Sequence, residues 1–254
     1  MNTRWTAILT ASLLIGCVSS DGSKALKRED PTEAAAKTNI QLGIAYLQQG
    51  NYAVAREKLE RSLKQNPKDP DVHTSLGLLY DRVGETKLAD KHFREALKLA
   101  PDNPDVSNNY AIYLCKRGRV DEGVERFSAV ATNKYYRTPE VALSNAGVCL
   151  RGAKRYEEAG NAFAHALQIR PNYAEAMFQA ADLRMERGEI AEGREQLDKY
   201  LQSYDATADL LLLGVRMARA QNDRMGEEKY TRRLRVEFAG SEQLRSLEPN
   251  RNPG

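Results

Sequence analysis

The sequence predicts an all-α fold, a solenoid of about six helix-turn-helix repeats, on the strength of three observations. First, Gly50, Gly84 and Gly118 lie 34 residues apart, each after an apolar-periodic stretch where a helix needs a left-handed residue to end. Second, small and large residues recur at fixed offsets along the chain. Third, no stretch alternates with period two for long enough to predict a sheet.

The helical region is expected over residues 31–240, with two residues inserted before the fourth unit and one removed before the sixth. Helix starts are indicated by a capping residue followed by proline, as in Asp30-Pro31, Asp69-Pro70 and Asn103-Pro104. Residues 241–254 are expected to form a disordered C-terminal tail. The six units are expected at residues 36–69, 70–103, 104–137, 140–173, 174–206 and 207–240.

Within each unit, two columns of small residues face one column of large ones. Small residues opposite large ones let two helices cross closely, so the glycines and alanines are expected to admit the ring of the neighbouring helix. The first small column is Gly43, Gly77, Ala111, Gly147, Ala181 and Gly214; the second is Ala55, Ala89, Gly123, Ala159, Gly193 and Gly226; the large column is Leu59, Phe93, Phe127, Phe163, Leu197 and Tyr230.

This pattern resembles the tetratricopeptide repeat (TPR), a family of helix pairs stacked into a superhelix. The likeness implies a TPR superhelix in which the first helices of successive units line the concave surface. The residues that carry it are Leu42-Gly43, Tyr46, Ala55, Leu59 and Pro67 in the first unit, and Leu76-Gly77, Tyr80, Ala89, Phe93, Ala96 and Pro101 in the second.

The amino-terminal residues differ from the repeats. Arg4 is followed by an apolar stretch that is too short to span a bilayer and that ends in Leu14-Ile15-Gly16-Cys17. This resembles a bacterial lipoprotein signal peptide, which implies a signal over residues 1–16, lipid attachment at Cys17 and a lipidated polar tether over residues 17–30. Because residue 18 is Val rather than Asp, the implied location is the periplasmic face of the outer membrane. An ordinary secretory signal with a coincidental cysteine is the alternative.

Charge and composition argue against several classes of partner. The formal net charge of +3 would fall to +2 if the signal with Arg4 were removed, and no basic stripe with interleaved aromatic residues is present. No nucleic-acid partner is therefore expected. One basic cluster stands in the last unit, either as a soluble end-repeat surface or as a binding patch. It comprises Arg216, Arg219, Arg224, Arg232, Arg233 and Arg235.

The sequence predicts no enzyme. The histidines His73, His92 and His165 fall at different repeat positions without metal-ligand spacing, and we expect them on the surface. No serine has the context of a nucleophile elbow, and no glycine-rich loop follows a strand. We therefore expect no catalytic residues, metal, cofactor or small-molecule substrate.

Two cysteines remain once Cys17 is assigned to lipid. Cys115 is the twelfth residue of the third unit and Cys149 the tenth of the fourth, so both lie late on first helices that pack side by side. In an oxidising compartment an even number of cysteines favours a disulfide. The alternative is two small core residues that never oxidise.

Positions 5, 9 and 12 of each first helix should face the concave surface. Position 9 reads Ile44, Leu78, Ile112, Val148, Asp182 and Val215 through the six units. Four consecutive aliphatic residues on a wall that normally faces solvent predict a groove for an amphipathic segment of another protein. The alternative is that a neighbouring helix, or the first helix, covers them. The predicted groove residues are Ile40, Ile44, Leu47, Leu78, Ile112 and Val148.

A closer resemblance is carried by the stretches Ile40–Leu47, Asn108–Cys115 and Leu211–Ala218, together with the lipid-attachment sequence and six repeats. They resemble the PilF/PilW family of type IV pilus biogenesis lipoproteins. The resemblance implies an adaptor, or pilotin, that binds PilQ-like secretin subunits and promotes their outer-membrane localisation and multimerisation. It also implies an apolar groove in the first repeats, at Ile40, Ile44, Leu47 and Leu78. The alternative function is a TPR scaffold or activator lipoprotein for cell-wall enzymes or for outer-membrane protein assembly.

Overall fold

The computed structural model describes residues 30–247, so the predicted signal peptide, the lipid on Cys17 and the tether up to residue 29 lie outside the described residues. Within that range every regular element is a helix, which confirms the predicted all-α TPR solenoid. Six helix pairs are followed by one short helix. The helices are α1 Pro31–Gln48, α2 Tyr52–Gln65, α3 Pro70–Arg82, α4 Thr86–Leu99, α5 Pro104–Lys116, α6 Val120–Thr132, α7 Pro139–Gly152, α8 Tyr156–Ile169, α9 Ala174–Glu186, α10 Ile190–Ser203, α11 Ala208–Ala220, α12 Arg224–Glu237 and α13 Glu242–Leu247.

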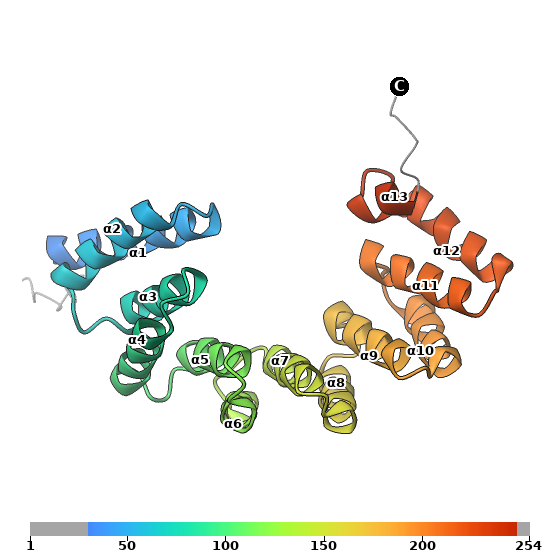
Figure 1. The fold of residues 1–254 in the computed structure, drawn as a ribbon, viewed down its shortest axis with the longest axis horizontal. Coiled ribbons are helices and arrows are strands. Elements are labelled where there is room, and N and C mark those ends of the chain that lie inside the picture. The colour runs from blue at the N-terminus through green and yellow to red at the C-terminus, as the bar shows by residue number, and fades with distance from the viewer. Residues whose placement is uncertain (1–29, 248–254) are drawn as a thin grey trace, which may run out of the picture.

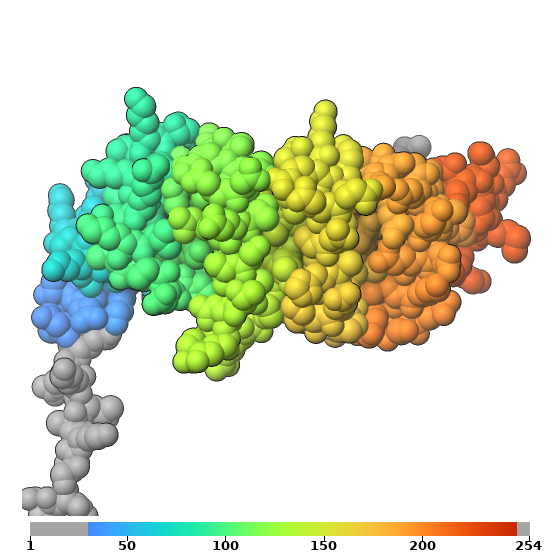
Figure 2. All heavy atoms as spheres, turned by 90° about the horizontal axis from the view of Figure 1, so that it is seen from below, coloured from blue at the N-terminus to red at the C-terminus, as the bar shows by residue number. Residues whose placement is uncertain are grey.

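The helix pairs form an open arc (Figure 1). From α3 on, the first helix of each pair lies on the inner side of the arc and the second on the outer side (Figure 1), and consecutive pairs follow one another along its length (Figure 2). Each helix packs mainly on its pair partner and on the next pair along the chain. Among residues 30–247, no helix is both long and apolar enough to cross a membrane.

Local chemistry begins and ends the helices as the sequence indicates. Asp30 and Asp69 cap α1 and α3 by accepting hydrogen bonds from the backbone N–H two residues on, at 2.7 and 2.9 Å. Between the helices of a pair the chain takes a left-handed residue, with φ from +74° to +82° at the glycines. Lys154 and Asn222 occupy that place in the fourth and sixth units. The left-handed positions are Gly50, Gly84, Gly118, Lys154, Gly188 and Asn222.

The core is built from the predicted contacts between small and large residues. Phe163 and Tyr230 are fully buried against the backbone of Gly147 and Gly214 in their pair partners. A Cβ at Gly214 would lie 2.7 Å from Cδ1 of Tyr230, closer than real Cβ contacts allow. The glycines therefore set the distance between the two helices of a pair.

Replacing Gly147 by Ala should lower the free energy of unfolding by about 1–3 kcal/mol, because the new methyl group would overlap the buried ring of Phe163. The matched control is Gly152→Ala in the same helix, where nothing lies within 4 Å of the added Cβ. Urea unfolding of both variants measures the difference. Equal stability of the two variants would show that the α7–α8 distance is not limited at Gly147.

The carboxyl-terminal end departs from the prediction. Disorder was expected from residue 241, but residues 242–247 form α13, and the expectation is wrong for this segment. Leu244 of α13 is buried with Leu211 and Val215 of α11, which belong to the inner side of the last unit. Val215 is consequently inaccessible, so position 9 of the sixth unit offers nothing to a partner.

Candidate partner-binding groove

The predicted groove residues lie on the inner helices of the first four units. Ile44, Leu78 and Ile112 are half-buried, and Val148 is 45% exposed. Ile40 is only 6% exposed and belongs to the core, and Leu47 is half-buried against the same core cluster. The position-9 side chains of α1, α3, α5 and α7 are therefore partly open to solvent, whereas Ile40 mainly supports them.

These side chains line two separate hollows. The first hollow lies between α1 and α3 and has a volume of about 450 Å³. Its apolar wall is Ile40, Ile44 and Leu78, and Asp69 and Asp71 at the start of α3 also line it. Leu47, which was predicted as a groove residue, does not line the first hollow.

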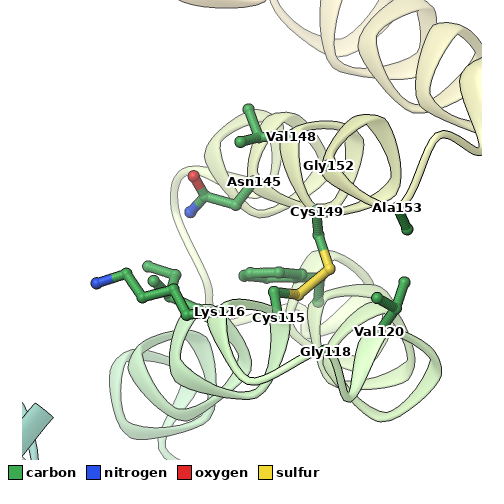
Figure 3. Close-up of a pocket in the computed structure, with 11 residues that line it drawn as sticks. Cys115, Lys116, Gly118, Val120, Asn145, Val148, Cys149, Gly152 and Ala153 are labelled. Carbon is green, nitrogen blue, oxygen red and sulfur yellow. A yellow bond between two sulfur atoms is a disulfide. The ribbon is translucent and has the colours of Figure 1, made fainter. Parts of the chain in front are cut away.

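The second hollow lies between α5 and α7 and has a volume of about 580 Å³. Ile112, Val148 and the ring of Phe127 line it together with Cys115 and Cys149. In Figure 3 the disulfide crosses between the two helices, with Asn145 and Lys116 on one side of it and Val120 and Ala153 on the other.

The two cysteines are joined, with 5.5 Å between their Cα atoms. Cys115 is half-buried near the end of α5, and Cys149 is buried on α7, so the bond ties the third unit to the fourth and lines the second hollow. This is the disulfide that the sequence favoured from the positions of the two cysteines in adjacent repeats, given an oxidising compartment.

An amide contact lies beside the second hollow. The side-chain nitrogen of Asn145 on α7 donates to the side-chain oxygen of Asn108 on α5 at 3.2 Å. The next residue, Asn109, lines the first hollow, while Asn145 lines the second. Each hollow therefore has an asparagine beside its apolar residues.

The apolar stripe stops at the fifth unit. Arg151 on α7 donates to Asp182 and Glu186 on α9, at 2.7 Å each. Burial opposes the charge of Arg151, but these carboxylates outweigh it and raise the pKa of the guanidinium. Asp182 holds position 9 of its unit, so an ion pair replaces the aliphatic side chain there.

The structure corrects one expectation about histidines. His73 was expected on the surface, but it is 8% exposed. Its Nε2 lies 3.0 Å from the carbonyl oxygen of Pro67, and its Nδ1 lies 3.1 Å from Nδ1 of His92, whose ring stacks on Tyr80. His165 is exposed as expected. Within residues 30–247, no three His, Cys, Asp or Glu side chains are grouped so that they could hold a metal ion.

The histidine pair predicts a loss of stability in acid. If His73 Nε2–H donates to the carbonyl oxygen of Pro67, then His73 Nδ1 accepts from His92 Nδ1–H. A second proton on the His73 ring would then sit on Nδ1, where it would face the N–H of His92 instead of an acceptor. Burial, His73 and Lys91 lower the pKa of His92 to about 4. Between this value and 6.5 the unfolded chain binds more protons than the folded one, so stability should fall as pH falls through that window.

After allowance for the partial exposure of His92, the expected loss is about 1–2 kcal/mol. It is measured by urea unfolding at pH 7 and pH 4.5 in the wild type and in His92→Gln, with His165→Asn as the control. The wild type and the control should lose more stability in acid than His92→Gln does. Parallel losses in all three would exclude the histidine pair as the cause.

Comparisons with known proteins agree with the fold. Two family models, both described as tetratricopeptide repeat, match residues 40–104 and 74–134 in one case and residues 150–213 in the other. The chain is 29% identical over 233 residues to the type IV pilus assembly protein PilF of Pseudomonas aeruginosa, and the match covers 92% of each chain.

Solved structures of PilF and PilW are also similar to this chain. A structure of Pseudomonas aeruginosa PilF matches with a TM-score of 0.64 and 28% identity, covering 87% of this chain and 100% of that one. A structure of PilW, described as a widely conserved type IV pilus biogenesis factor, matches with a TM-score of 0.65 and 26% identity, covering 84% and 98%. A tetratricopeptide repeat protein from Parabacteroides merdae, at 16% identity and a TM-score of 0.60, shares the fold alone.

Proposed function

Because the chain belongs to the tetratricopeptide-repeat family and is PilF/PilW-like, we propose that it is an adaptor in type IV pilus biogenesis. In this proposal, lipid on Cys17 holds it at the periplasmic face of the outer membrane. The inner groove binds PilQ-like secretin subunits and promotes their outer-membrane localisation and multimerisation.

The observation that carries the proposal is the series of partly open aliphatic side chains at position 9. Ile44, Leu78, Ile112 and Val148 occupy the inner face of four consecutive units, and two hollows lie beside them. Apolar surface removed from water on binding contributes about 25 cal/mol per Å², so a client segment with two apolar anchors would gain affinity at both hollows. Asn109 in the first hollow and Asn145 in the second could fix its register by hydrogen bonds to its backbone.

The proposed mechanism needs no chemical step. Acyl chains on Cys17 would contribute about 0.8 kcal/mol per buried methylene, so a chain with several of them would stay at the membrane. Tethering would raise the effective concentration of a bound subunit there, and covering its apolar segment would delay misassembly in the periplasm. Differential binding is then sufficient for the adaptor to act.

The test uses a deletion strain complemented with the wild type, Ile44→Asp or the control Ile169→Asp. Ile169 ends α8 on the outer layer and is 44% exposed, so the control places the same substitution away from the groove. Secretin multimers in the outer-membrane fraction should fall at least fivefold with Ile44→Asp and should persist with the control. Multimers that persist in the deletion strain itself would overturn the proposal. Capture of cell-wall enzymes instead of secretin would favour the scaffold alternative.

A further inference from the structure

We infer that the first hollow takes a client segment in which an apolar side chain is closely followed by lysine or arginine. The inference rests on the proposed function and specifies the chemistry of the client that the inner groove would bind. It combines the shape of the hollow with the charge at one end of it.

The apolar part of the first hollow is firmly supported. Ile44 of α1 and Leu78 of α3 both line the hollow, and both pack on the buried core cluster that contains Ile40. The side chains are half-buried, so a bound apolar group would complete their burial without a rearrangement of the core. This part of the hollow would hold one aliphatic or aromatic anchor.

The polar part is acidic. Asp69 and Asp71 line the hollow where α3 begins, and neither carboxylate forms an ion pair with any of residues 30–247. Lys37 lines the opposite wall, and its ammonium lies 3.3 Å from Glu33. The carboxylates thus present negative charge to whatever enters the hollow.

Both acids stand at the N-terminus of α3, where negative charge is favourable, but only one of them has a hydrogen-bond partner there. Asp69 accepts the backbone N–H of Asp71 and caps α3, whereas no hydrogen bond is made by the side chain of Asp71 within the described residues. Partial burial raises the pKa of Asp71, and the neighbouring charges of Asp69 and Asp105 add to the rise. A lysine or arginine beside the apolar anchor of a client would supply the missing positive charge.

The experiment selects binders from a random peptide library displayed on phage, using the whole chain as bait. A double variant, Asp69→Asn with Asp71→Asn, removes the charge and keeps the capping ability of residue 69. The matched control, Asp102→Asn with Asp205→Asn, removes two exposed carboxylates that do not line either hollow. Affinities of the selected peptides are then measured at low and high salt.

The expected result is enrichment of peptides with an apolar residue next to lysine or arginine. These peptides should bind the Asp69→Asn/Asp71→Asn variant about three- to tenfold more weakly, and the control normally, since two partly exposed ion pairs are lost. Changing the basic residue of a selected peptide to Glu should weaken its binding to the wild type, and the Asp71→Lys variant should restore that binding.

Enrichment of apolar peptides without a basic preference, or equal affinity for both double variants, overturns the inference. A failure to enrich any peptide, as would follow if a second copy of the chain filled the hollow, also overturns it. Secretin subunits are captured in parallel. Capture that is lost with Ile44→Asp but unchanged with Asp69→Asn/Asp71→Asn rejects the inference and keeps the proposed function. If the library shows a basic preference but the protein captures no secretin, the inference is kept and the proposed function is rejected.

Discussion

Reduction of the disulfide between Cys115 and Cys149 is expected to lower the free energy of unfolding by about 4 kcal/mol on the chain-entropy estimate for a loop of this length. The sequence separation is 34 residues, and the bond joins α5 to α7, so it restrains two adjacent units in the unfolded chain. Because a solenoid is stabilised by contacts between neighbouring units, the loss should be concentrated in the third and fourth. Thermal unfolding with and without reductant measures the total, and hydrogen exchange of α5–α8 locates it.

The control for that prediction is the double variant Cys115→Ala with Cys149→Ala. It should unfold at the temperature of the reduced wild type and should not respond to reductant. An oxidised wild type that melts at the same temperature in the presence and absence of reductant would contradict the expected contribution.

The second large effect concerns binding. Val148→Asp should weaken the affinity for secretin subunits about 100-fold, because a carboxylate buried without a partner at an interface costs about 2–3 kcal/mol. Val148 is 45% exposed on α7 and lines the second hollow, so the unbound protein should tolerate the substitution. Titration of labelled secretin subunits with the purified protein gives the ratio of the dissociation constants.

The matched control is Val236→Asp. Val236 lies on α12 of the outer layer and is 78% exposed, so the same substitution there should leave both affinity and melting temperature unchanged. If Val148→Asp keeps full affinity, the second hollow is not part of the client site. If both variants lose affinity equally, the effect is one of charge rather than of the groove.

The helix pairs could be predicted from the sequence because the same local rules recur in each unit. Glycine in the left-handed conformation follows the first helix in four of the units, and close crossing in the pairs with a glycine in the first small column explains why a Cβ at Gly214 would overlap Tyr230. Lys154 and Asn222 occupy the same left-handed place without glycine, since the surrounding turn determines their backbone conformation.

The end of the solenoid could not be predicted in this way, because it breaks the repeat. Leu244 lies in a helix of six residues, too short to show an apolar period, yet it covers Val215 on the inner face. His73 was misplaced for a similar reason. Its burial depends on Pro67 and His92, which come from other elements and have no fixed offset in the repeat.

The groove was only partly predictable. Helical periodicity places Ile44, Leu78, Ile112 and Val148 on one face of four helices, and the structure has them there. The division into two hollows and the acidic end of the first depend on which side chains fill the space between neighbouring helices. From the sequence, Asp69 indicated only a helix start, and the packing of α1 on α3 places Asp69 and Asp71 in the same hollow as Ile44.

The most direct test of the account is site-specific photo-crosslinking in living cells. A photoreactive amino acid replaces Val148 in the groove or Val236 on the outer layer, and the crosslinked products are identified by mass spectrometry. The account predicts secretin subunits crosslinked from position 148 and none from position 236. Crosslinks to secretin from position 236 alone, or secretin absent from both, would contradict it.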